Sequence, residues 1–352
     1  MNEADGKKIK VMIVEDSDVV RELLVYLLGN DPDISVVGAI SNGEEAIEAV
    51  NRLHPDVITM DVNMPKMNGL EATRTIMETH PTPIVVVSGS VTHNELSGTF
   101  DALEAGALAV VQKPKGLRSN DFSEIANQLT QTVKLMSEIK VVKRWKNNGL
   151  SGDIKQKVAI KPTIKEHIDI VAIGASTGGP VILKNILQLI KKNLCAPILV
   201  VQHITPGFTQ GFADWLAQAT GFPVHLAQDG LVPLIGHVYI APDHHHMQLS
   251  HAGKIVLNNG ISINGHRPSV SSLFRSIAEN KGSRAIGVLL TGMGKDGADE
   301  LKLMREKGAI TIAQNKETSI VYGMPKEAIA LNAASYVLSP EGIAKLVNEL
   351  VI

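Results

Sequence analysis

The chain has 352 residues, of which 44% are hydrophobic, so it can bury two cores if its domains span roughly 100 to 200 residues each. Its formal net charge of −2 excludes a general electrostatic attraction to nucleic acid or anionic lipid, and 3% aromatic residues argue against base-stacking surfaces. The one cysteine, Cys195, excludes an intramolecular disulfide and fits a reducing compartment. Because no segment reaches about 18 uninterrupted apolar residues, we expect a soluble cytoplasmic protein without direct membrane insertion.

The first part of the chain, from Ile9 to Pro114, alternates short β-branched runs with longer amphipathic ones. The runs that predict strands are, in chain order, IKVMIVED, ISVVGA, DVITMD, PIVVVSG and LAVVQKP. The segment SNGEEAIEAVNRL predicts a helix, because Ile47, Val50 and Leu53 fall on one face. This alternation is typical of a doubly wound parallel sheet.

Residues 122–146 predict one more helix, and a connecting segment follows it. The run NNGLSGDIKQKVAIKPTIKEH contains Gly, Pro and Lys without a clear period, which is typical of a linker. Residues 134–166 hold nine Lys or Arg and three Asp or Glu, the one marked charge bias in the chain. We interpret this basic segment as a solvated connector, with docking to an acidic partner as the alternative.

A second alternation begins at Ile168 and predicts a larger α/β unit. Its predicted strands are IDIVAIG, PILVVQH, AIGVLLTGMG and ITIAQ, and its predicted helices are VILKNILQLI, a segment from about Phe208, RPSVSSLFRSIAEN and DGADELKLMREKG. A β-rich stretch runs from HVYIAP through KIVLNNGISI, which predicts an antiparallel addition to a doubly wound, mainly parallel sheet.

Three carboxylates follow predicted strands of the first unit: Glu15 and Asp16 after KVMIV, and Asp61 after DVITM. Functional groups collect at the carboxyl ends of strands in open α/β sheets, so these three can converge. Clustered carboxylates favour a hard divalent cation, and Mg²⁺ held in this way also binds phosphoryl oxygens, which makes Asp61 a candidate phosphoryl acceptor. Ser88 and Lys113, at two further strand ends, offer a hydroxyl and a cation to the same group.

The motifs VEDS, MDVNMPKMNG, VVSG and QKP, which carry these residues, resemble a two-component receiver domain. The resemblance implies a flavodoxin-like fold with a five-stranded parallel sheet, and a phosphoryl group that Asp61 accepts from a histidine kinase. It places Glu15, Asp16 and Asp61 at the Mg²⁺ that phosphorylation requires. It also implies that Ser88 and Lys113 are the residues that respond to phosphorylation.

The stretch GASTGGP, residues 174–180, lies between a strand-like run and an amphipathic helical run, so the chain turns sharply around Ser176. Its G-x-S-x-G pattern is that of a nucleophile elbow, in which glycines permit the turn and the following helix supplies N–H groups. A P-loop needs Gly-Lys-Ser/Thr and a dinucleotide loop needs G-x-G-x-x-G, and this stretch has neither. The alternative is a glycine-rich loop that only lets helix and strand pack.

A serine nucleophile needs a base and an orienting acid, and two later strand ends offer them. His203 ends PILVVQH, and Asp296 lies in the glycine-rich loop just beyond AIGVLLTGMG. Ser176, His203 and Asp296 can therefore converge on one edge of a parallel sheet. The order Ser, His, Asp differs from that of α/β-hydrolases, chymotrypsin-like proteases and subtilisins, which disfavours a typical lipase or peptidase.

The motifs IGASTGGP, VVQHI, VYIAPDHHHM, HRPSV and GVLLTGMGKDGA, behind a receiver domain and a linker, resemble chemotaxis protein-glutamate methylesterases of the CheB type. The resemblance implies hydrolysis of glutamyl γ-methyl esters on methyl-accepting chemotaxis proteins and deamidation of their glutamines, without a cofactor for the ester reaction. It implies that Ser176 is the nucleophile, His203 the general base and Asp296 the orienting acid, with backbone N–H groups at Thr177 and Met293 stabilising the oxyanion. It also implies that the unphosphorylated receiver packs over the esterase cleft and that phosphorylation uncovers the cleft.

Three features depart from these families or suggest another site. Many receivers have an aromatic switch residue where this chain has Val110, so we expect the phosphorylation response to run through surface repacking. Ser271 follows HRPSV where many CheB-type proteins have an acidic residue, so we expect a changed contact in the cleft or with the receptor. His244 to His246 are adjacent, whereas a closed zinc site needs spaced ligands, so we expect loop residues near the mouth of the site.

The sequence divides into a receiver domain at residues 7–125, a helix end and linker at 126–166, and a methylesterase domain at 167–352. The alternative to an enzyme is a phospho-switch adaptor that binds chemoreceptors without catalysis, although such a module has no need for the three residues of a triad. A transcriptional regulator is disfavoured because the second half has no compact helix-turn-helix with a basic face. An esterase or deamidase that acts on receptors outside chemotaxis stays open.

Overall fold

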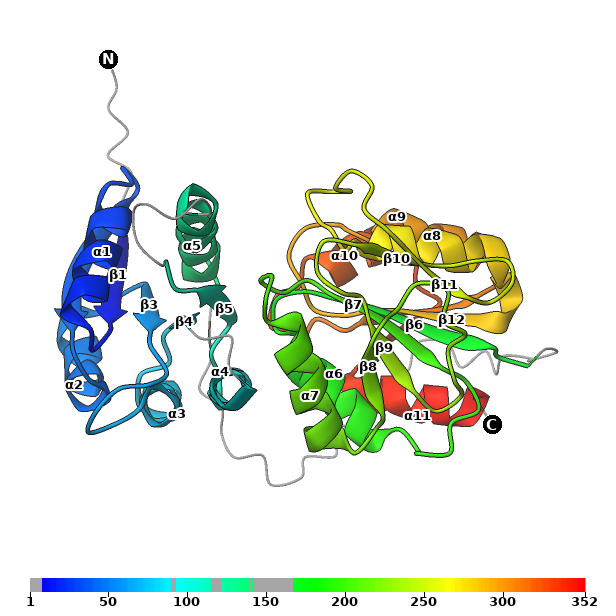
Figure 1. Ribbon diagram of the computed structural model, residues 1–352, viewed down its shortest axis with the longest axis horizontal. Helices are drawn as coiled ribbons and strands as arrows, with labels where there is room; N and C mark the ends of the chain where they lie inside the picture. The colour runs from blue at the N-terminus through cyan, green and yellow to red at the C-terminus, as the bar shows by residue number, and fades with distance from the viewer. Residues whose placement is uncertain (1–7, 90–92, 115–121, 140, 142–166, 352) are drawn as a thin grey trace, which may run out of the picture. The chain divides into compact units, whose positions relative to one another are not determined.

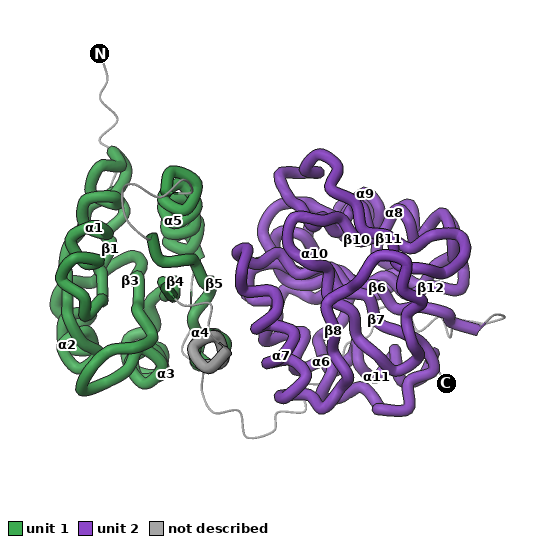
Figure 2. Tube along the Cα trace, viewed as in Figure 1, with its two compact units in different colours: residues 1–160 green, residues 161–352 purple. Residues whose placement is uncertain are grey.

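The computed structural model describes residues 8–89, 93–114, 122–139, 141 and 167–351. The chain divides into two compact units, residues 1–160 and residues 161–352, each built on its own sheet (Figure 2). The division falls in the predicted linker, whose part from 142 to 166 lies outside the described residues, as does most of the basic segment. The domain limits predicted at single-residue level stay predictions.

The first unit is a parallel sheet of five described strands in the order β2-β1-β3-β4-β5, the order of flavodoxin-like folds. Its strands are β1 (Ile9–Val14), β2 (Ile34–Ile40), β3 (Val57–Met60), β4 (Ile84–Ser88) and β5 (Ala109–Gln112). Its described helices are α1 (Asp18–Gly29), α2 (Gly43–Leu53), α3 (Gly69–Thr79), α4 (His93–Ala105) and α5 (Phe122–Ser137). Strands β3 and β4 are buried along their whole length, as expected for a sheet with helices on both faces. The fold predicted for this half is confirmed.

Helix α5 differs from its predicted limits. It ends at Ser137 rather than near residue 146, and the remainder of the prediction, 142–146, lies outside the described residues. The helix also runs through the boundary predicted at residue 125. Its buried residues share one face that packs on the sheet of the first unit: Ile125, Leu129, Val133 and Met136.

The second unit has a seven-stranded parallel sheet in the order β14-β13-β12-β6-β7-β9-β8 and an antiparallel pair, β10-β11, among the described residues. Its strands are β6 (Ile170–Ala175), β7 (Ile198–Gln202), β8 (Val224–Leu226), β9 (Val238–Ile240), β10 (His246–Leu249), β11 (Ile255–Asn258), β12 (Ala285–Leu289), β13 (Ile310–Gln314) and β14 (Tyr336–Leu338). Its helices are α6 (Gly179–Leu189), α7 (Thr209–Thr220), α8 (Val270–Asn280), α9 (Ala298–Glu306), α10 (Met324–Ala330) and α11 (Pro340–Leu350), with the short 3-10 turn η1 (Gly282–Arg284). The predicted antiparallel addition is confirmed, and it forms a sheet of its own rather than an edge of the main one.

Helices cover both faces of the second sheet (Figure 1). Helices α6, α7 and α11 pack together on one face, while α8, α9 and α10 lie on the other, together with the β10-β11 hairpin. Leu273, Phe274 and Ile277 of α8 are fully buried in the core between that helix and the sheet. Among the described residues no helix combines the length and the apolar character that a membrane crossing requires.

Strand β6 is the first strand of the second sheet and lies between β12 and β7. From β6 the chain continues to β7 on one side, and a later strand, β12, is added on the other side of β6. The strand order therefore reverses at β6. Open α/β sheets bind ligands at the carboxyl ends of the strands where such a reversal occurs. The topology therefore brings together the loops that follow β6, β7 and β12.

Candidate active site and receiver site

Ser176 follows β6 directly and stands at the turn into α6. Gly178, which caps the start of this helix, has φ of +79°, in the left-handed region that glycine adopts without steric cost. The Ser176 N–H donates to Thr291 O at 3.0 Å, and Thr291 Oγ1 donates to Thr177 O at 3.0 Å, so the turn is tied to the loop after β12. The same loop carries Met293, whose side chain is 38% exposed.

His203 follows the neighbouring strand, β7, and contacts Asp296 from the loop before α9. His203 Nε2 lies 3.0 Å from Asp296 Oδ2, and both side chains are buried. An ionised carboxylate only accepts hydrogen bonds, so Nε2 carries the proton in the neutral ring. His203 Nδ1 is buried and has no hydrogen-bond partner among the described residues, so it is the ring nitrogen left to accept a proton.

Asp296 is 1% exposed and is held by donors from the segment that leads into α8 and from the first turn of that helix. These donors, besides His203, are Asn264 Nδ2 (3.0 Å), Ser269 Oγ (2.8 Å), Val270 N (2.7 Å) and Ser271 N (3.3 Å). Burial alone would raise its pKa, but the hydrogen bond from His203 and the charge of that ring when it is protonated, with the Asn264 and Ser269 donors, hold the pKa of Asp296 well below its usual range. The carboxylate therefore stays ionised, and it also caps the N-terminus of α8 by accepting hydrogen bonds from its first backbone N–H groups.

Ser271 belongs to the support of Asp296. It is 1% exposed, and its hydroxyl accepts hydrogen bonds from Gly297 N at 3.0 Å and from Asn264 Nδ2 at 3.2 Å. The changed contact expected from the sequence, in the cleft or with the receptor, stays a prediction, and the buried side chain does not itself reach the surface. The residue instead links the segment before α8 to the loop that carries Asp296.

The three adjacent histidines lie in different surroundings. His246 begins β10 and is 2% exposed, with Nε2 2.9 Å from Ile261 O. His245 is exposed and has Nδ1 2.9 Å from Asp243 O, and His244 is exposed with φ of +61°. The prediction of loop residues is therefore wrong for His246, which is a buried residue of strand β10.

His266 is a residue of this site that sequence reasoning missed. Its ring stacks on His203, with centroids 3.8 Å apart and planes inclined by 11°. Burial, and then the neighbouring His203, lower the pKa of His266 to about 4, against the opposing charge of Asp296. At neutral pH an uncharged ring therefore lies flat against the proposed base.

This stacking predicts a dependence of stability on pH. The folded state favours neutral His266, so its contribution to stability is complete above the unfolded pKa near 6.5 and is lost as the pH falls toward 4. In a fragment of residues 167–352, His266→Gln is expected to reduce proton uptake on unfolding in this range by up to one proton. Urea unfolding between pH 4.5 and 7 measures the slope, and equal slopes for both proteins would contradict the prediction.

In the first unit, the predicted receiver residues meet at the carboxyl ends of β1, β3 and β5. Lys113 Nζ lies 2.8 Å from Glu15 Oε2 and 3.1 Å from Asp61 Oδ2, while Asp61 Oδ1 accepts from Val62 N at 2.8 Å. Burial raises the pKa of Glu15 and of Asp61, although Lys113 opposes this. Burial thus disfavours the ionised forms of Glu15 and Asp61, and Lys113 is the cation that pairs with both.

The donor set here fits a hard divalent cation. Glu15, Asp16 and Asp61 each offer a carboxylate oxygen, and these oxygens lie within 4.8 Å of one another. Ser88 ends the strand between β3 and β5, and its Oγ accepts a weak hydrogen bond from Thr99 Oγ1 at 3.4 Å. The predicted carboxylates and Lys113 therefore lie together, while their roles, the role of Ser88 and the expectation drawn from Val110 stay predictions.

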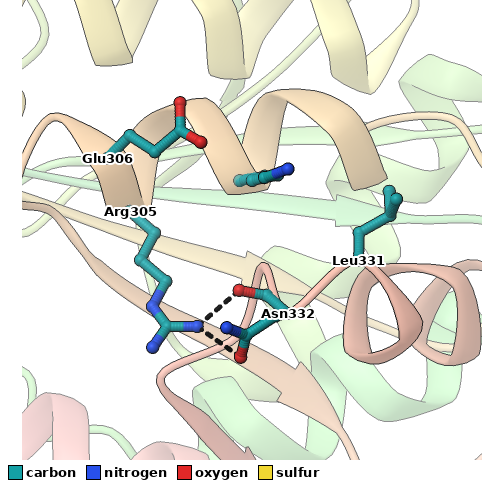
Figure 3. Close-up of a pocket in the computed structure, with 5 residues that line it drawn as sticks. Arg305, Glu306, Leu331 and Asn332 are labelled. Atoms are coloured by element: carbon teal, nitrogen blue, oxygen red, sulfur yellow. Dashed lines mark hydrogen bonds between the residues drawn. The ribbon is translucent and has the colours of Figure 1, made fainter.

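A surface pocket of the second unit lies away from the Ser176 site. It is lined by Lys302, Arg305, Glu306, Leu331 and Asn332, from the second half of α9 and the end of α10 (Figure 3). Arg305 donates to the backbone and side-chain oxygens of Asn332, the latter at 2.8 Å, so its guanidinium is partly occupied. Helix α9 begins beside the Asp296 loop, so this pocket is at its opposite end.

Comparison with known proteins assigns both units to known domain families. Residues 171–347 match the family model of the CheB methylesterase, and residues 11–120 match that of the response regulator receiver domain. The chain is 51% identical to a protein-glutamate methylesterase/protein-glutamine glutaminase of Nitrosospira multiformis over 97% of each chain, and 53% identical to one of Syntrophus aciditrophicus over 97% of this chain and 98% of that one.

A solved structure supports the same assignment for the second unit. The crystal structure of the Thermotoga maritima CheB methylesterase catalytic domain aligns with a TM-score of 0.51 and 42% identity, covering 53% of this chain and 100% of that domain. The relatives match along nearly the whole length, so the order of the two domains is shared as well. The chain therefore belongs to the CheB methylesterase family, with a response regulator receiver domain ahead of the methylesterase domain.

Proposed function

We propose that this protein hydrolyses glutamyl γ-methyl esters, and deamidates glutamines, on methyl-accepting chemotaxis receptors, with Ser176, His203 and Asp296 as a catalytic triad. The observation that carries the proposal is the arrangement of His203, which lies beside the strand that Ser176 follows. Its Nε2 binds the ionised, buried Asp296, and its Nδ1 has no partner among the described residues. The names of the relatives state both activities for those proteins. A non-catalytic adaptor has no use for a base that is oriented in this way.

The geometry supports a two-step hydrolysis. Ser176 Oγ attacks the ester carbonyl carbon while His203 Nδ1 takes the hydroxyl proton, and Asp296 stabilises the imidazolium that forms. Backbone N–H groups at Thr177 and Met293 are the proposed oxyanion donors, because both lie on the loops that flank Ser176. His203 then returns the proton to the methoxide, methanol leaves, and water clears the glutamyl-enzyme with His203 again as base. With a glutamine substrate the leaving group is ammonia.

We infer that a chemotaxis histidine kinase supplies the phosphoryl group for Asp61. Glu15 and Asp16, together with Asp61, would hold Mg²⁺, which supplies charge neutralisation for the incoming phosphoryl group when bound. Lys113, now paired with both buried carboxylates, is placed to pair with the phosphoryl oxygens instead. Ser88 is the proposed hydroxyl donor to the same group.

Methanol release from methyl-labelled chemoreceptor membranes tests the switch. With a small-molecule phosphodonor and Mg²⁺, wild-type protein is expected to release methanol faster than without them. Asp61→Asn is expected to keep the resting rate and to lose the whole increase, and chelation of Mg²⁺ is expected to do the same to wild type. An increase that survives in Asp61→Asn would contradict the proposed acceptor.

We further propose that the unphosphorylated receiver restrains the methylesterase domain. A fragment of residues 167–352 is then expected to release methanol without phosphodonor at a rate comparable with the phosphorylated full chain. The measurement compares initial rates at equal molar concentration. A fragment as slow as the resting full chain, with intact cooperative unfolding, would count against this restraint.

A further inference from the structure

Gln202 is the last residue of β7 and precedes the proposed base. Its side chain is 3% exposed, and its amide nitrogen donates to Ser176 O at 2.8 Å and to His203 O at 2.9 Å. The acceptors are thus the backbone carbonyls of the proposed nucleophile and the proposed base. Two carbonyl oxygens face the same amide atom, so this atom must be the nitrogen, which donates.

These two hydrogen bonds connect the chain segments that follow β6 and β7. The register of β6 and β7 ends at the pair Ala175 and Gln202, and the last backbone bond beyond it runs from His203 N to Ala175 O at 2.9 Å. After that point β6 turns into α6 while β7 continues into a loop. The Gln202 amide therefore makes one more link between the two chains, at the level where the reacting side chains begin.

The chain makes room for this amide at Gly179, the first residue of α6. A methyl group at Gly179 would lie 2.1 Å from Gln202 Oε1 and 2.8 Å from Ala175 Cβ. Gln202 Oε1 is buried and has no hydrogen-bond partner among the described residues. A buried acceptor without a partner costs stability, so its two donated bonds must compensate for it.

We propose that Gln202 is a positioning residue that fixes the separation of Ser176 and His203 by binding the backbone of both. The inference rests on the proposed triad. A nucleophile and base that drift by about 1 Å lose on the order of 10²-fold in rate, so losing this link lowers the rate of the chemical step and leaves substrate binding in place. Gln202 touches neither substrate nor proton, and its effect passes through the two residues that it holds.

The test compares variants of the full chain, assayed with phosphodonor and Mg²⁺. Gln202→Met keeps a long buried side chain without donors and is expected to lower kcat, and the rate of Ser176 labelling by a fluorophosphonate, by about 10- to 100-fold. KM is expected to stay within about threefold, on the same reasoning. Thr311→Val is the matched control, because it removes a buried donor of β13, two strands away from β6, whose hydroxyl bonds Ala333 O, and it is expected to change stability without changing kcat.

Two further variants separate hydrogen bonding from shape. A buried carboxyl group in Gln202→Glu donates one hydrogen bond when protonated and none when ionised, so its labelling rate should fall relative to wild type as the pH rises. Gly179→Ala crowds the amide and should also lower kcat. The double variant Gly179→Ala/Gln202→Met should be no slower than the slower single variant, because both changes break one link.

Several outcomes would overturn the proposal. They are a Gln202→Met variant that keeps more than half of the wild-type kcat, a change confined to KM, a Gln202→Glu variant that matches wild type at all pH values, or fully additive effects in the double variant. Ser176→Ala, assayed in parallel, distinguishes these results from a failure of the triad. If Ser176→Ala is inactive while Gln202→Met is fully active, the triad stands and the positioning role is wrong.

Discussion

Replacing Ser176 with alanine is expected to lower kcat for methanol release by roughly 10⁶-fold, the size of loss seen when a serine nucleophile is removed from other triads. Ser176 follows β6 directly, and alanine differs from serine by one oxygen, so the fold is expected to survive. The activity that remains reflects the oxyanion donors and substrate binding alone.

The measurement is methanol release from labelled receptor membranes, with the folded state checked by urea unfolding. Thr177→Val is the matched control, because its change is confined to the side chain of the next residue while the proposed oxyanion donor is its backbone N–H. Substantial methanol release by Ser176→Ala would reject the nucleophile and favour a different catalytic group.

Asp296→Asn is expected to lower kcat by about 10⁴-fold, and the network around the carboxylate explains why. An amide nitrogen at the place of Oδ2 donates to His203 Nε2, so the ring proton moves to Nδ1 and the base is blocked. An amide nitrogen at the place of Oδ1 meets donors from Asn264, Ser269 and Ser271 instead. Either orientation loses at least one buried hydrogen bond, so we also expect a loss of about 1–3 kcal/mol in unfolding free energy.

Ser269→Ala supplies the control for this second prediction. It removes one donor from Asp296 Oδ1 but leaves the carboxylate charged and bound to His203. We expect the rate to fall by less than about tenfold, since one neutral hydrogen bond contributes about 1 kcal/mol. Equal losses of activity in Ser269→Ala and Asp296→Asn would show that packing of the loop, rather than the orienting charge, controls the rate.

Much of the architecture could be predicted because parallel strands buried on both faces read as continuous apolar runs. The same logic placed Ser176, His203 and Asp296 at neighbouring strand ends. Strand β8 was missed because it has only three residues and its central His225 is exposed. The start of helix α11 could have been predicted from the sequence, since a serine followed by a proline is typical of a helix N-terminus. In the structure the Ser339 hydroxyl accepts from Gly342 N, and a proline is the first residue of the helix.

The partners of Asp296 could not be predicted from the sequence. Asn264 and Ser269 precede it by 32 and 27 positions, and no period relates such residues. The stacking of His266 on His203 depends in the same way on how the segment before α8 lies against the sheet. The position of Gln202 directly before His203 was a hint of a role in the site. Its two acceptors, however, are backbone atoms, and residue types do not reveal backbone contacts.

The bonds from Val270 N and Ser271 N to Asp296 have a practical consequence for experiments in cells. Through them Asp296 holds the N-terminus of α8 in the core. A variant without this carboxylate is therefore expected to be degraded faster as well as to be inactive. In a strain that carries such a variant, loss of catalytic activity could not be distinguished from a lower amount of protein. Ser176→Ala removes a hydroxyl that makes no hydrogen bond to a helix among the described residues, so it is the better inactive reference wherever receptor methylation is compared at equal protein abundance.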